Sequence, residues 1–317
     1  MIKEFKKIDS EIKENYSLKE LTTFKIGGKA KYFSLVINEE QLINLTKLCQ
    51  ENNISFLVIG GGSNILISDN GFDGLVIKLK LNILNIQDNI IEVSADIPLA
   101  NLIGQSVATN LSGLELMTGI PGTIGGAVVG NAGGYGTQIS DYLEKVIVLD
   151  DNYKLRELSN KDLNFKYRDS LLKENNWILI KVYLKLKLGN RQESLKEMIR
   201  ISQDRFTKHP HFPSAGSTFK NIELNDEIIN KLKEKNVDIP EKFFEYQKIP
   251  AAFLIEQLDL KGKMIGGAQV SEKHANHIVN VKNASADDII QLISLIKMKV
   301  RDEYGIELQE EVRYIGF

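Results

Sequence analysis

Apolar residues recur along the chain in short runs that are typical of buried strands. Most of these runs are five or six residues long and lie next to Gly, Asn or Asp, a pattern that predicts strands separated by turns. One longer segment alternates apolar residues with lysine, as a half-buried strand does. The predicted strands occupy residues 54–59, 65–69, 74–79, 90–95, 145–150 and 177–188.

Other segments repeat apolar residues at the helical spacing of three or four. The N-terminal series Ile2, Phe5, Ile8 and Ile12 has this spacing. Four further helices are predicted. Pro98 starts the helix over 98–108, and the segment 192–206 is helical by pattern. A helix over 250–262 runs from Pro250 to Gly262, and one over 285–305 starts at a Ser285–Asp288 capping box and ends at Gly305.

The C-terminal segment 306–315 alternates in the way expected of a strand. One face of this strand would carry Ile306, Leu308, Glu310, Val312 and Tyr314. The other face would carry Glu307, Gln309, Glu311 and Arg313. The sequence therefore predicts that Glu311 is aimed away from the packed face, and plain solvent exposure is the alternative explanation.

Length and charge set the broad class of the protein. A chain of 317 residues predicts two domains, since a domain usually holds about 150 residues. The formal net charge of −2 excludes a general basic surface for nucleic acid. Cys49 is the single cysteine, so no disulfide can form within the chain and no thiolate metal cluster is possible. A reducing compartment fits this composition.

No segment reads as a membrane span or a signal peptide. The uncharged run 116–140 is too rich in glycine and polar residues for a spanning helix, which wants about 20 mostly apolar residues. The N-terminal residues 1–14 lack the apolar core of a signal peptide. We therefore expect a cytoplasmic monomer that binds small molecules, with neither membrane nor nucleic acid as a partner.

Glycine is ordinary in amount and unusual in distribution. Nine of the 24 glycines lie between Gly113 and Gly136, and three more form the run Gly60–Gly62. Glycine is needed where φ is positive or where backbone approaches a ligand closely. Turns alone are one explanation for the clusters. The small residues around both clusters favour a cradle for a ligand.

Neither cluster fits the common nucleotide loops. The triple glycine leads into Ser63-Asn64 rather than into a G-x-G-x-x-G helix start, and 125–130 is followed by Asn131 where a P-loop requires lysine. These departures disfavour a Rossmann fold and a Walker NTPase. No G-x-S-x-G elbow occurs. The four histidines, all at 209 or later, are expected at the surface or lining a pocket, with no metal site.

Several blocks resemble, in order, the UDP-N-acetylenolpyruvoylglucosamine reductase family. The matching blocks are LTTFKIGGKA (21–30), VIGGGSNILISD (58–69), GIPGTIGGAVVGNAGGYG (119–136), YRDS (167–170), SAGSTFKN (214–221), IGGAQVSEKHANHIVN (265–280) and EEVRYIG (310–316). They span almost the whole chain. The short interval from Arg168 to Ser217 is similar to that of the compact subgroup of the family.

The resemblance implies an α+β protein. It would comprise an FAD-binding domain of the vanillyl-alcohol-oxidase type, made of two α+β subdomains, with a smaller α/β substrate domain inserted before the last strand. The boundaries implied are 1–205 plus 306–317 for the FAD-binding domain and 206–305 for the substrate-binding domain. Residues 222–248 look like extra sequence within the second domain, either a lid over the UDP end of the substrate or an inert insertion.

The resemblance also implies the reaction. NADPH would reduce a non-covalent FAD, and the enolpyruvyl group of the UDP-sugar would then be reduced to a lactyl ether, giving UDP-N-acetylmuramate for peptidoglycan. Ser217 would protonate the α-carbon, Arg168 would stabilise negative charge on the substrate, and Glu311 would help to stabilise the intermediate. From the residues alone, Arg168 could equally pair with Asp169, and Ser217 could be a turn residue.

The remaining implied site residues fall into two groups. Those implied to bind FAD are Gly60, Gly61, Gly62, Ser63, Asn64, Pro121, Gly122, Thr123, Gly125, Gly126, Ala127, Asn131 and Gly133. Those implied to line the substrate are Tyr135, Arg205, Lys220, Asn221 and His274. Two alternatives stay open from the sequence: a related FAD-dependent oxidase of another alcohol or sugar, and a non-catalytic nucleotide-binding module.

Overall fold

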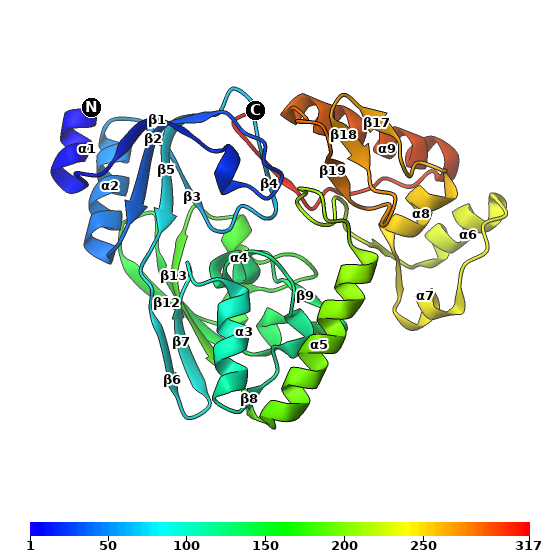
Figure 1. Ribbon diagram of the computed structural model, residues 1–317, viewed down its shortest axis with the longest axis horizontal. Coiled ribbons are helices and arrows are strands. Elements are labelled where there is room, and N and C mark those ends of the chain that lie inside the picture. The colour runs from blue at the N-terminus through cyan, green and yellow to red at the C-terminus, as the bar shows by residue number, and fades with distance from the viewer. The chain divides into compact units, whose positions relative to one another are not determined.

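The computed structural model describes residues 1–317, and its internal packing divides the chain into two compact units (Figure 1). Unit 1 comprises Met1–Tyr16, Ala30–Gly62 and Phe72–Thr207. Unit 2 comprises Ser17–Lys29, Ser63–Gly71 and Lys208–Phe317. Each unit has its own hydrophobic core, and each combines helices with sheets.

Unit 1 contains a four-stranded sheet in the order β1-β2-β5-β3. Its strands are β1 (Lys13–Ser17), β2 (Lys29–Val36), β5 (Phe72–Leu79) and β3 (Ser55–Ile59), and β5 pairs in parallel with both β2 and β3. Helices α1 (Ile2–Ile8) and α2 (Glu39–Glu51) lie together beside this sheet (Figure 1). Parallel strands need a crossover connection, and α2 supplies the one from β2 to β3.

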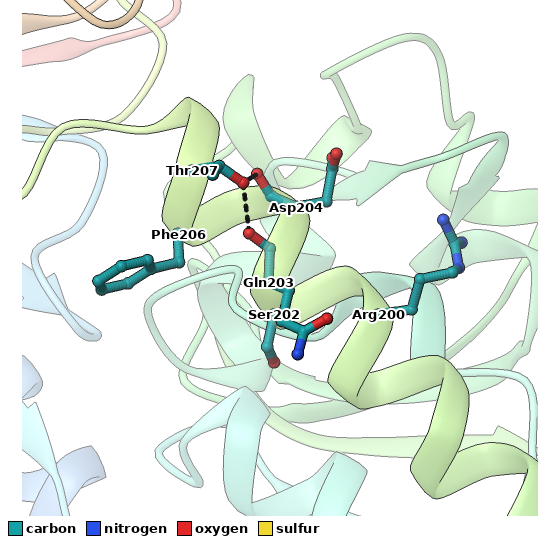
Figure 2. A pocket seen from close by; sticks show the side chains of 6 residues that line it. All are labelled: Arg200, Ser202, Gln203, Asp204, Phe206 and Thr207. Carbon is teal, nitrogen blue, oxygen red and sulfur yellow. Dashed lines mark hydrogen bonds between the residues drawn. The ribbon is translucent and has the colours of Figure 1, made fainter.

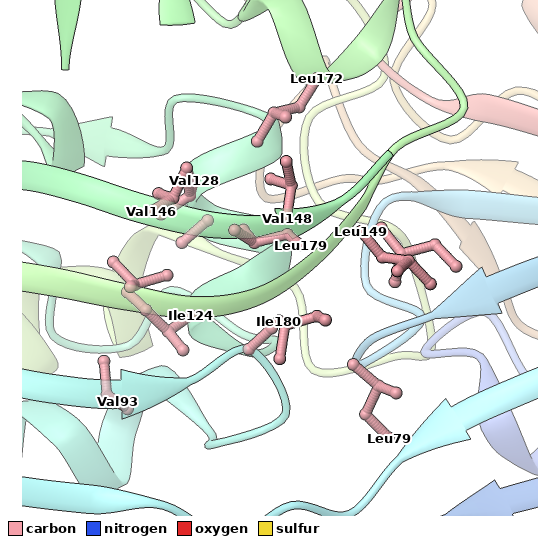
Figure 3. Close-up of a cluster of buried hydrophobic side chains, with 14 of the residues drawn as sticks. Leu79, Val93, Ile124, Val128, Val146, Val148, Leu149, Leu172, Leu179 and Ile180 are labelled. Atoms are coloured by element: carbon pink, nitrogen blue, oxygen red, sulfur yellow. The ribbon is translucent and has the colours of Figure 1, made fainter. Parts of the chain in front are cut away.

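A second, antiparallel sheet in unit 1 has the order β12-β11-β13-β7-β6. Its strands are β6 (Leu84–Gln87), β7 (Ile90–Ser94), β11 (Leu143–Leu149), β12 (Leu155–Ser159) and β13 (Ile178–Lys185). Side chains of its strands, including Val146 and Ile180, point toward Ile124 and Val128 of helix α4 (Ile124–Val129) and form a fully buried core (Figure 3).

The rest of unit 1 consists of two helices, two small ladders and short turns of 3-10 helix. The helices are α3 (Leu99–Ala108) and α5 (Arg191–Lys208). The ladders pair β8 (Leu111–Ser112) with β14 (Lys187–Leu188), and β9 (Gly133–Gly134) with β10 (Thr137–Gln138). The 3-10 turns are Glu115–Met117, Ile139–Asp141, Lys161–Leu163 and Leu171–Lys173, and another, Lys19–Leu21, belongs to unit 2.

Unit 2 packs its sheets against the long helix α9 (Ala286–Tyr304). One sheet has the order β17-β18-β19, made of Met264–Ile265, Ala268–Val270 and Ile278–Asn280. A parallel ladder joins β4 (Ile65–Ile67) to β20 (Arg313–Ile315). The remaining elements are α8 (Ala251–Gln257), β15 (Ile222–Glu223), α6 (Asp226–Glu234), α7 (Glu241–Glu245) and β16 (Lys248–Ile249).

Residues 222–248 form an integral part of unit 2. Strands β15 and β16 pair at the base of the segment, and helices α6 and α7 lie between them. Leu232 of α6 and Phe243 of α7 are buried in the same core as Ile249 and Leu254. The segment is not a detachable loop, because removing it would expose apolar core surface.

The predicted helices and strands are confirmed apart from small shifts at their ends, except that two of them, 250–262 and 306–315, are much shorter than predicted. The helix predicted over 250–262 stops at Gln257, since the chain turns at Asp259, which has a positive φ of 51°. The predicted strand 306–315 is regular only over Arg313–Ile315. Its alternation is confirmed at Ile306, Leu308 and Val312, which are buried, whereas Tyr314 is exposed. The α+β class is confirmed.

The compact units differ from the predicted domain boundaries at the C-terminus. The sequence grouped 306–317 with residues 1–205. In the structure β20 does pair with β4, which lies at 65–67, but both strands pack in unit 2. The reason is that Ile306, Leu308 and Val312 are buried in the unit 2 core. No helix of the protein is long and apolar enough to cross a membrane.

Helix α9 has the ends that the sequence predicts. Ser285 accepts a hydrogen bond from Asp288 N at 3.0 Å, and Asp288 accepts one from Ser285 N at 3.0 Å, which completes a capping box. Gly305 ends the helix in the left-handed conformation, with φ 63°. The helix that anchors the unit 2 core is therefore fixed at both ends by local sequence.

Replacing the helix cap tests how much this local signal contributes. We expect Ser285→Ala to lower the free energy of unfolding by about 1 kcal/mol, because the backbone N–H of Asp288 loses its side-chain partner. Urea unfolding followed by circular dichroism measures the change. Lys299→Ala, at an exposed position of the same helix, is the control and should change stability by less than about 0.5 kcal/mol. Equal effects of the two variants would contradict the role of the cap.

Candidate active site

The two glycine clusters of the sequence meet in unit 1. A Cβ on Gly60 would lie 2.6 Å from Thr123 Oγ1, and a Cβ on Gly61 would lie 2.6 Å from Gly122 Cα. Only glycine allows loops to approach this closely. The peptide N–H groups of Gly60 and Gly61 donate no hydrogen bond within the protein. Neighbouring peptide N–H groups of this kind bind phosphate oxygens, so the residues fit the pyrophosphate of FAD.

Two of the residues implied to bind FAD are also required by packing. Gly125 N donates to Ala95 O at 2.9 Å, and a Cβ on Gly125 would lie 2.8 Å from the Ala95 side chain. Asn131 is fully buried and its amide donates to Gln138 Oε1 at 3.0 Å and to Lys166 O at 2.9 Å. The side chain of Asn131 is therefore committed to protein groups.

The other residues implied to bind FAD lie along the same two stretches of sequence. Gly62 follows β3, Ser63 and Asn64 precede β4, Pro121 precedes α4, Gly126 and Ala127 lie within α4, and Gly133 lies in β9.

Arg168 lies in a tight turn between Lys166 and Asp169. The backbones of these two residues exchange two hydrogen bonds of 3.1 Å. Within the turn Arg168 has a φ of 57°, in the left-handed region. Its guanidinium donates from Nη2 to Gly133 O at 2.8 Å, while Asp169 pairs with Lys173 at 3.8 Å. The guanidinium of Arg168 is therefore hydrogen-bonded to the glycine-rich stretch, and the carboxylate of Asp169 has Lys173 as an ion-pair partner.

Two of the predicted site residues that are neither Asn nor Asp have a strained backbone. Fifteen residues other than glycine have a positive φ, and ten of them are Asn or Asp, which tolerate it best. Tyr135, with φ 54°, and Arg168 are among the five others. Such a conformation costs about 1–3 kcal/mol and is concentrated at functional sites. The other three of the five are Lys25, Tyr153 and Gln247.

Tyr135 is joined to helix α5 by a hydrogen bond and a ring contact. Its hydroxyl donates to Asp204 Oδ2 at 2.6 Å, and the Arg205 guanidinium lies 5.4 Å from the centroid of its ring. Burial, followed by the hydrogen bond to Asp204, raises the pKa of Tyr135. The tyrosine is therefore neutral at physiological pH. Sequence reasoning missed Asp204, which has no distinguishing local signal.

Arg205 brings a second guanidinium toward Arg168. A Cβ on Gly119 would lie 2.8 Å from Arg205 Cδ, and one on Gly134 would lie 3.0 Å from Nη2, so these glycines make room for the side chain. The Nε atom of Arg205 is buried and has no hydrogen-bond partner. Burial, and to a smaller degree the charge of Arg168, lowers the pKa of Arg205. Two neighbouring positive groups favour an anionic ligand.

The strain at Arg168 can be measured with a matched pair of variants. Arg168→Ala and Arg168→Gly both remove the guanidinium, but only glycine relieves the left-handed backbone. We expect Arg168→Gly to be more stable than Arg168→Ala by about 1 kcal/mol. Urea unfolding of the two proteins gives the difference. If the alanine variant is the more stable of the two, the turn is not strained.

A surface depression of unit 1 lies on helix α5. It has a volume of about 670 Å³, and its lining residues all belong to α5: Arg200, Ser202, Gln203, Asp204, Phe206 and Thr207. Phe206 and Arg200 point to opposite sides of the helix (Figure 2). Only Asp204 links it to the predicted site, through Tyr135.

In unit 2 the segment that carries Ser217 is held from both sides. Thr218 N donates to Asn276 O at 2.8 Å on one side, and Thr218 O accepts from Glu311 N at 2.8 Å on the other. Ser217 lies directly opposite His277 in an antiparallel bridge. Two of the three predicted catalytic residues, Ser217 and Glu311, therefore lie on neighbouring segments of the same unit.

Two asparagine side chains fix this arrangement. Asn276 accepts from Phe219 N at 2.9 Å and donates to Phe219 O at 2.8 Å, which clamps the residue next but one to Ser217. The side-chain amide of Asn64 donates to Glu311 O at 3.0 Å, and the backbone carbonyl of Asn64 accepts from Arg313 N at 3.0 Å. The side chain of Asn64, implied to bind FAD, thus holds the backbone of Glu311.

The predicted substrate residues of unit 2 are also anchored. Lys220 N donates to Gln309 O at 2.8 Å, Asn221 Oδ1 accepts from Ala251 N at 3.4 Å at the start of α8, and His274 Nδ1 accepts from Asn276 N at 3.3 Å. The structure places Lys220 and Asn221 directly after the segment that carries Ser217. Arg168, Tyr135 and Arg205 lie in unit 1.

Three histidines form a cluster next to Ser217. The ring centroids of His209, His274 and His277 lie 4.7–5.5 Å apart, and His209 Nδ1 is 3.2 Å from His277 Nε2. His277 is 4% exposed, which corrects the expectation that it lies at the surface or lines a pocket. Burial, with a smaller effect of His274 and His209, lowers the pKa of His277 to about 3. No group of His, Cys, Asp or Glu side chains has the geometry to hold a metal ion.

The buried imidazole makes stability depend on pH. His277 has a pKa of about 3 in the folded protein and about 6.5 when unfolded, so between these values the unfolded chain binds more protons. We expect the free energy of unfolding to be about 2 kcal/mol lower at pH 5 than at pH 7 on account of this residue, since one pH unit corresponds to about 1.4 kcal/mol. Urea unfolding at both pH values measures it. If a His277→Phe variant loses as much free energy of unfolding between pH 7 and pH 5 as the wild type does, the pH dependence does not come from His277.

Two family models match separate parts of the chain. A model for the UDP-N-acetylenolpyruvoylglucosamine reductase C-terminal domain matches residues 208–315. A model for an FAD binding domain matches residues 30–159. The first match coincides with most of unit 2, and the second lies largely in unit 1.

Relatives with the same name as the first model match nearly the whole chain. A UDP-N-acetylenolpyruvoylglucosamine reductase of Caldanaerobacter subterraneus is 38% identical over 304 residues, which cover 95% of this chain and 93% of the relative. One of Clostridioides difficile is 38% identical over 309 residues, 96% of this chain and 94% of the relative. The crystal structure of the Thermus caldophilus enzyme is 31% identical, with a TM-score of 0.76, and covers 96% of this chain and 98% of that chain.

Proposed function

The chain belongs to the UDP-N-acetylenolpyruvoylglucosamine reductase family, and from this membership we propose that it reduces the enolpyruvyl group of UDP-N-acetylenolpyruvoylglucosamine to give UDP-N-acetylmuramate. The protein is an FAD-dependent oxidoreductase, and the hydride donor that we propose is NADPH. The observation that carries the proposal within the site is the pair Arg168 and Arg205, because the substrate to be reduced carries a carboxylate.

The residues available for FAD suit a non-covalent cofactor. The peptide N–H groups of Gly60 and Gly61, next to Gly122 and Thr123, would hold its phosphate groups. All four histidines of the chain lie at 209 or later, outside the residues matched by the FAD-binding model. When bound, FAD supplies the hydride chemistry of the reaction. The protein's part is to place the substrate and to control charge and protons.

Each catalytic role is assigned to a residue that matches the family motif. Arg168 would stabilise the negative charge that develops on the substrate carboxylate when the double bond is reduced, since a guanidinium keeps its charge and offers a planar pair of donors. Ser217 Oγ would give its proton to the α-carbon. Glu311, whose backbone is fixed to Thr218 and Asn64, would help to stabilise the intermediate.

Tyr135, Arg205, Lys220, Asn221 and His274 would contact the substrate. Tyr135 offers a neutral hydroxyl held by Asp204, and Arg205 offers a buried Nε–H that no protein group uses. An unsatisfied buried donor costs about 1–3 kcal/mol, which a bound anionic group would recover. Lys220 adds a positive charge in unit 2. These features suit a ligand with a carboxylate and a diphosphate.

Replacing Ser217 separates the two halves of the reaction. We expect Ser217→Ala to accept hydride from NADPH at the wild-type rate but to turn over the UDP-sugar about 10²–10⁴-fold more slowly, since only proton transfer is lost. Stopped-flow absorbance of the flavin follows each half separately. Ser294→Ala, at an exposed position of α9, is the control and should behave as the wild type. Normal turnover of Ser217→Ala would show that another group supplies the proton.

The same assay decides between a reductase and an oxidase. A reductase oxidises one equivalent of NADPH when it reduces its own FAD, and without dioxygen it oxidises more than that only when UDP-N-acetylenolpyruvoylglucosamine is added. An oxidase would instead consume dioxygen with an alcohol or a sugar and would ignore the enolpyruvyl group. Loss of all dependence on the UDP-sugar would therefore contradict the proposed function.

A further inference from the structure

We propose that His277 is a positioning residue for Ser217. Its Nδ1–H donates a hydrogen bond to Ser217 Oγ, which directs the hydroxyl proton toward the substrate and holds the alkoxide that remains after the proton is transferred. The proposal rests on the role of Ser217 in the proposed function. It adds a residue and a tautomer that the resemblance does not assign.

The geometry that carries the proposal is the bridge between Ser217 and His277. The two residues lie directly opposite each other in an antiparallel pair, so their side chains project to the same face. The Cβ atoms of such a pair are about 4.5–5.5 Å apart. We infer that rotation of the Ser217 side chain brings its hydroxyl to the imidazole opposite, while the His277 ring keeps its contact with His209. The backbone bond from Thr218 N to Asn276 O fixes the register.

Both atoms of the proposed hydrogen bond lack a partner in the protein. His277 Nδ1 is buried and makes no hydrogen bond. The Ser217 hydroxyl likewise makes none within the protein. Buried polar atoms are almost always paired, so an unpaired ring nitrogen next to an unpaired hydroxyl needs an explanation. A hydrogen bond that closes when substrate orders Ser217 provides one, because catalytic hydrogen bonds often tighten only in the complex.

His209 selects the tautomer that this bond requires. Its Nδ1 lies 3.2 Å from His277 Nε2. When His209 Nδ1–H donates to that nitrogen, the single proton of neutral His277 must sit on Nδ1, the nitrogen that has no partner in the protein. His209 is itself partly exposed, so it exchanges protons with water. The pair therefore links the buried Nδ1 to the surface through one hydrogen bond.

The environment keeps His277 neutral, which suits a donor that must not become an acid itself. Burial and the neighbouring imidazoles lower its pKa to about 3. A neutral Nδ1–H donates without competing with Ser217 as the proton source. In the transfer the Ser217 O–H bond breaks and a C–H bond forms at the α-carbon. The oxygen then accepts the Nδ1–H hydrogen bond until a proton from water restores the hydroxyl.

Asparagine and glutamine in place of His277 test the position of the N–H group. Asn places an amide nitrogen near the site of Nδ1, whereas Gln places one near Nε2. We expect His277→Asn to keep kcat within about fivefold of the wild type. His277→Gln and His277→Phe should lower kcat by about 10²-fold with KM unchanged, the low end for an interaction that acts through the general acid. Reduction of the flavin by NADPH should be unchanged in all three.

The control and the contradicting outcomes are defined by the same assay. His211→Gln removes another imidazole of unit 2, one that is exposed and lies 3.1 Å from Lys273, and should turn over as the wild type. Circular dichroism at the assay temperature confirms that each variant is folded. If His277→Phe turns over normally, or if His277→Gln retains more activity than His277→Asn, the positioning role is wrong.

A measurement without turnover tests the tautomer directly. Nitrogen-15 NMR of the imidazoles in the wild-type protein, as the FAD-bound enzyme in the oxidised state, distinguishes Nδ1–H from Nε2–H. We expect His277 to be neutral at pH 7 with its proton on Nδ1, and His209→Phe to shift the population toward Nε2–H. A proton on Nε2 in the wild type would overturn the proposal.

The two hypotheses fail in different ways. If the wild type does not oxidise NADPH in response to the UDP-sugar, the proposed function is wrong. If it does so and Ser217→Ala is impaired, but the His277 variants are not impaired in the predicted order, only the positioning role is wrong.

Discussion

The chemistry assigned to unit 2 depends on one short backbone segment being held on both of its edges. Residues 217–220 lie between the 276–277 segment and the 309–311 segment, and each edge is fixed by backbone hydrogen bonds of 2.8 Å. The Asn276 side chain adds two further bonds to Phe219. A serine hydroxyl is a poor acid in water, so its value as a proton donor depends on placement. This arrangement fixes the backbone beneath it and leaves the side chain free to rotate.

Unit 1 meets a different constraint, the need to bring backbone and positive charge close together. Glycine at 60, 61 and 122 lets two loops meet at distances that a Cβ would forbid. Glycine at 119 and 134 makes room for the side chain of Arg205. Arg168 has a strained, positive φ in the turn from which its guanidinium donates to Gly133 O. The clusters therefore serve two purposes. Some glycines leave N–H groups without a partner in the protein, and others accommodate an arginine.

The sequence was sufficient for the elements that have strong local signals. The capping box of α9, the strand before the triple glycine and the family motifs were all readable, because periodicity, caps and spacing are properties of neighbouring residues. The early end of α8 and the packing of 306–312 in unit 2 were not, since both depend on contacts between distant segments. The resemblance marks 222–248 as extra sequence because most members of the family run quickly from the SAGSTFKN block to the next helix, and only the folded chain shows that Leu232 and Phe243 are buried in the unit 2 core.

The same reasoning explains what was missed at the site. Asp204 and Asn276 are ordinary polar residues in the sequence, and only the folded chain shows that they hold Tyr135 and Phe219. His277 was grouped with exposed histidines because its H-x-x-H spacing carries no information about burial. Its position opposite Ser217 arises from pairing between residues sixty apart in the chain.

The most direct test of the central claim is a single turnover without dioxygen. The purified enzyme, with its FAD reduced by NADPH, is mixed with UDP-N-acetylenolpyruvoylglucosamine in deuterated water, and the product is examined by mass spectrometry and NMR. The account predicts UDP-N-acetylmuramate with one deuterium at the α-carbon and reoxidation of the flavin at the same rate. A flavin that stays reduced until dioxygen is admitted, with the sugar unchanged, would contradict it.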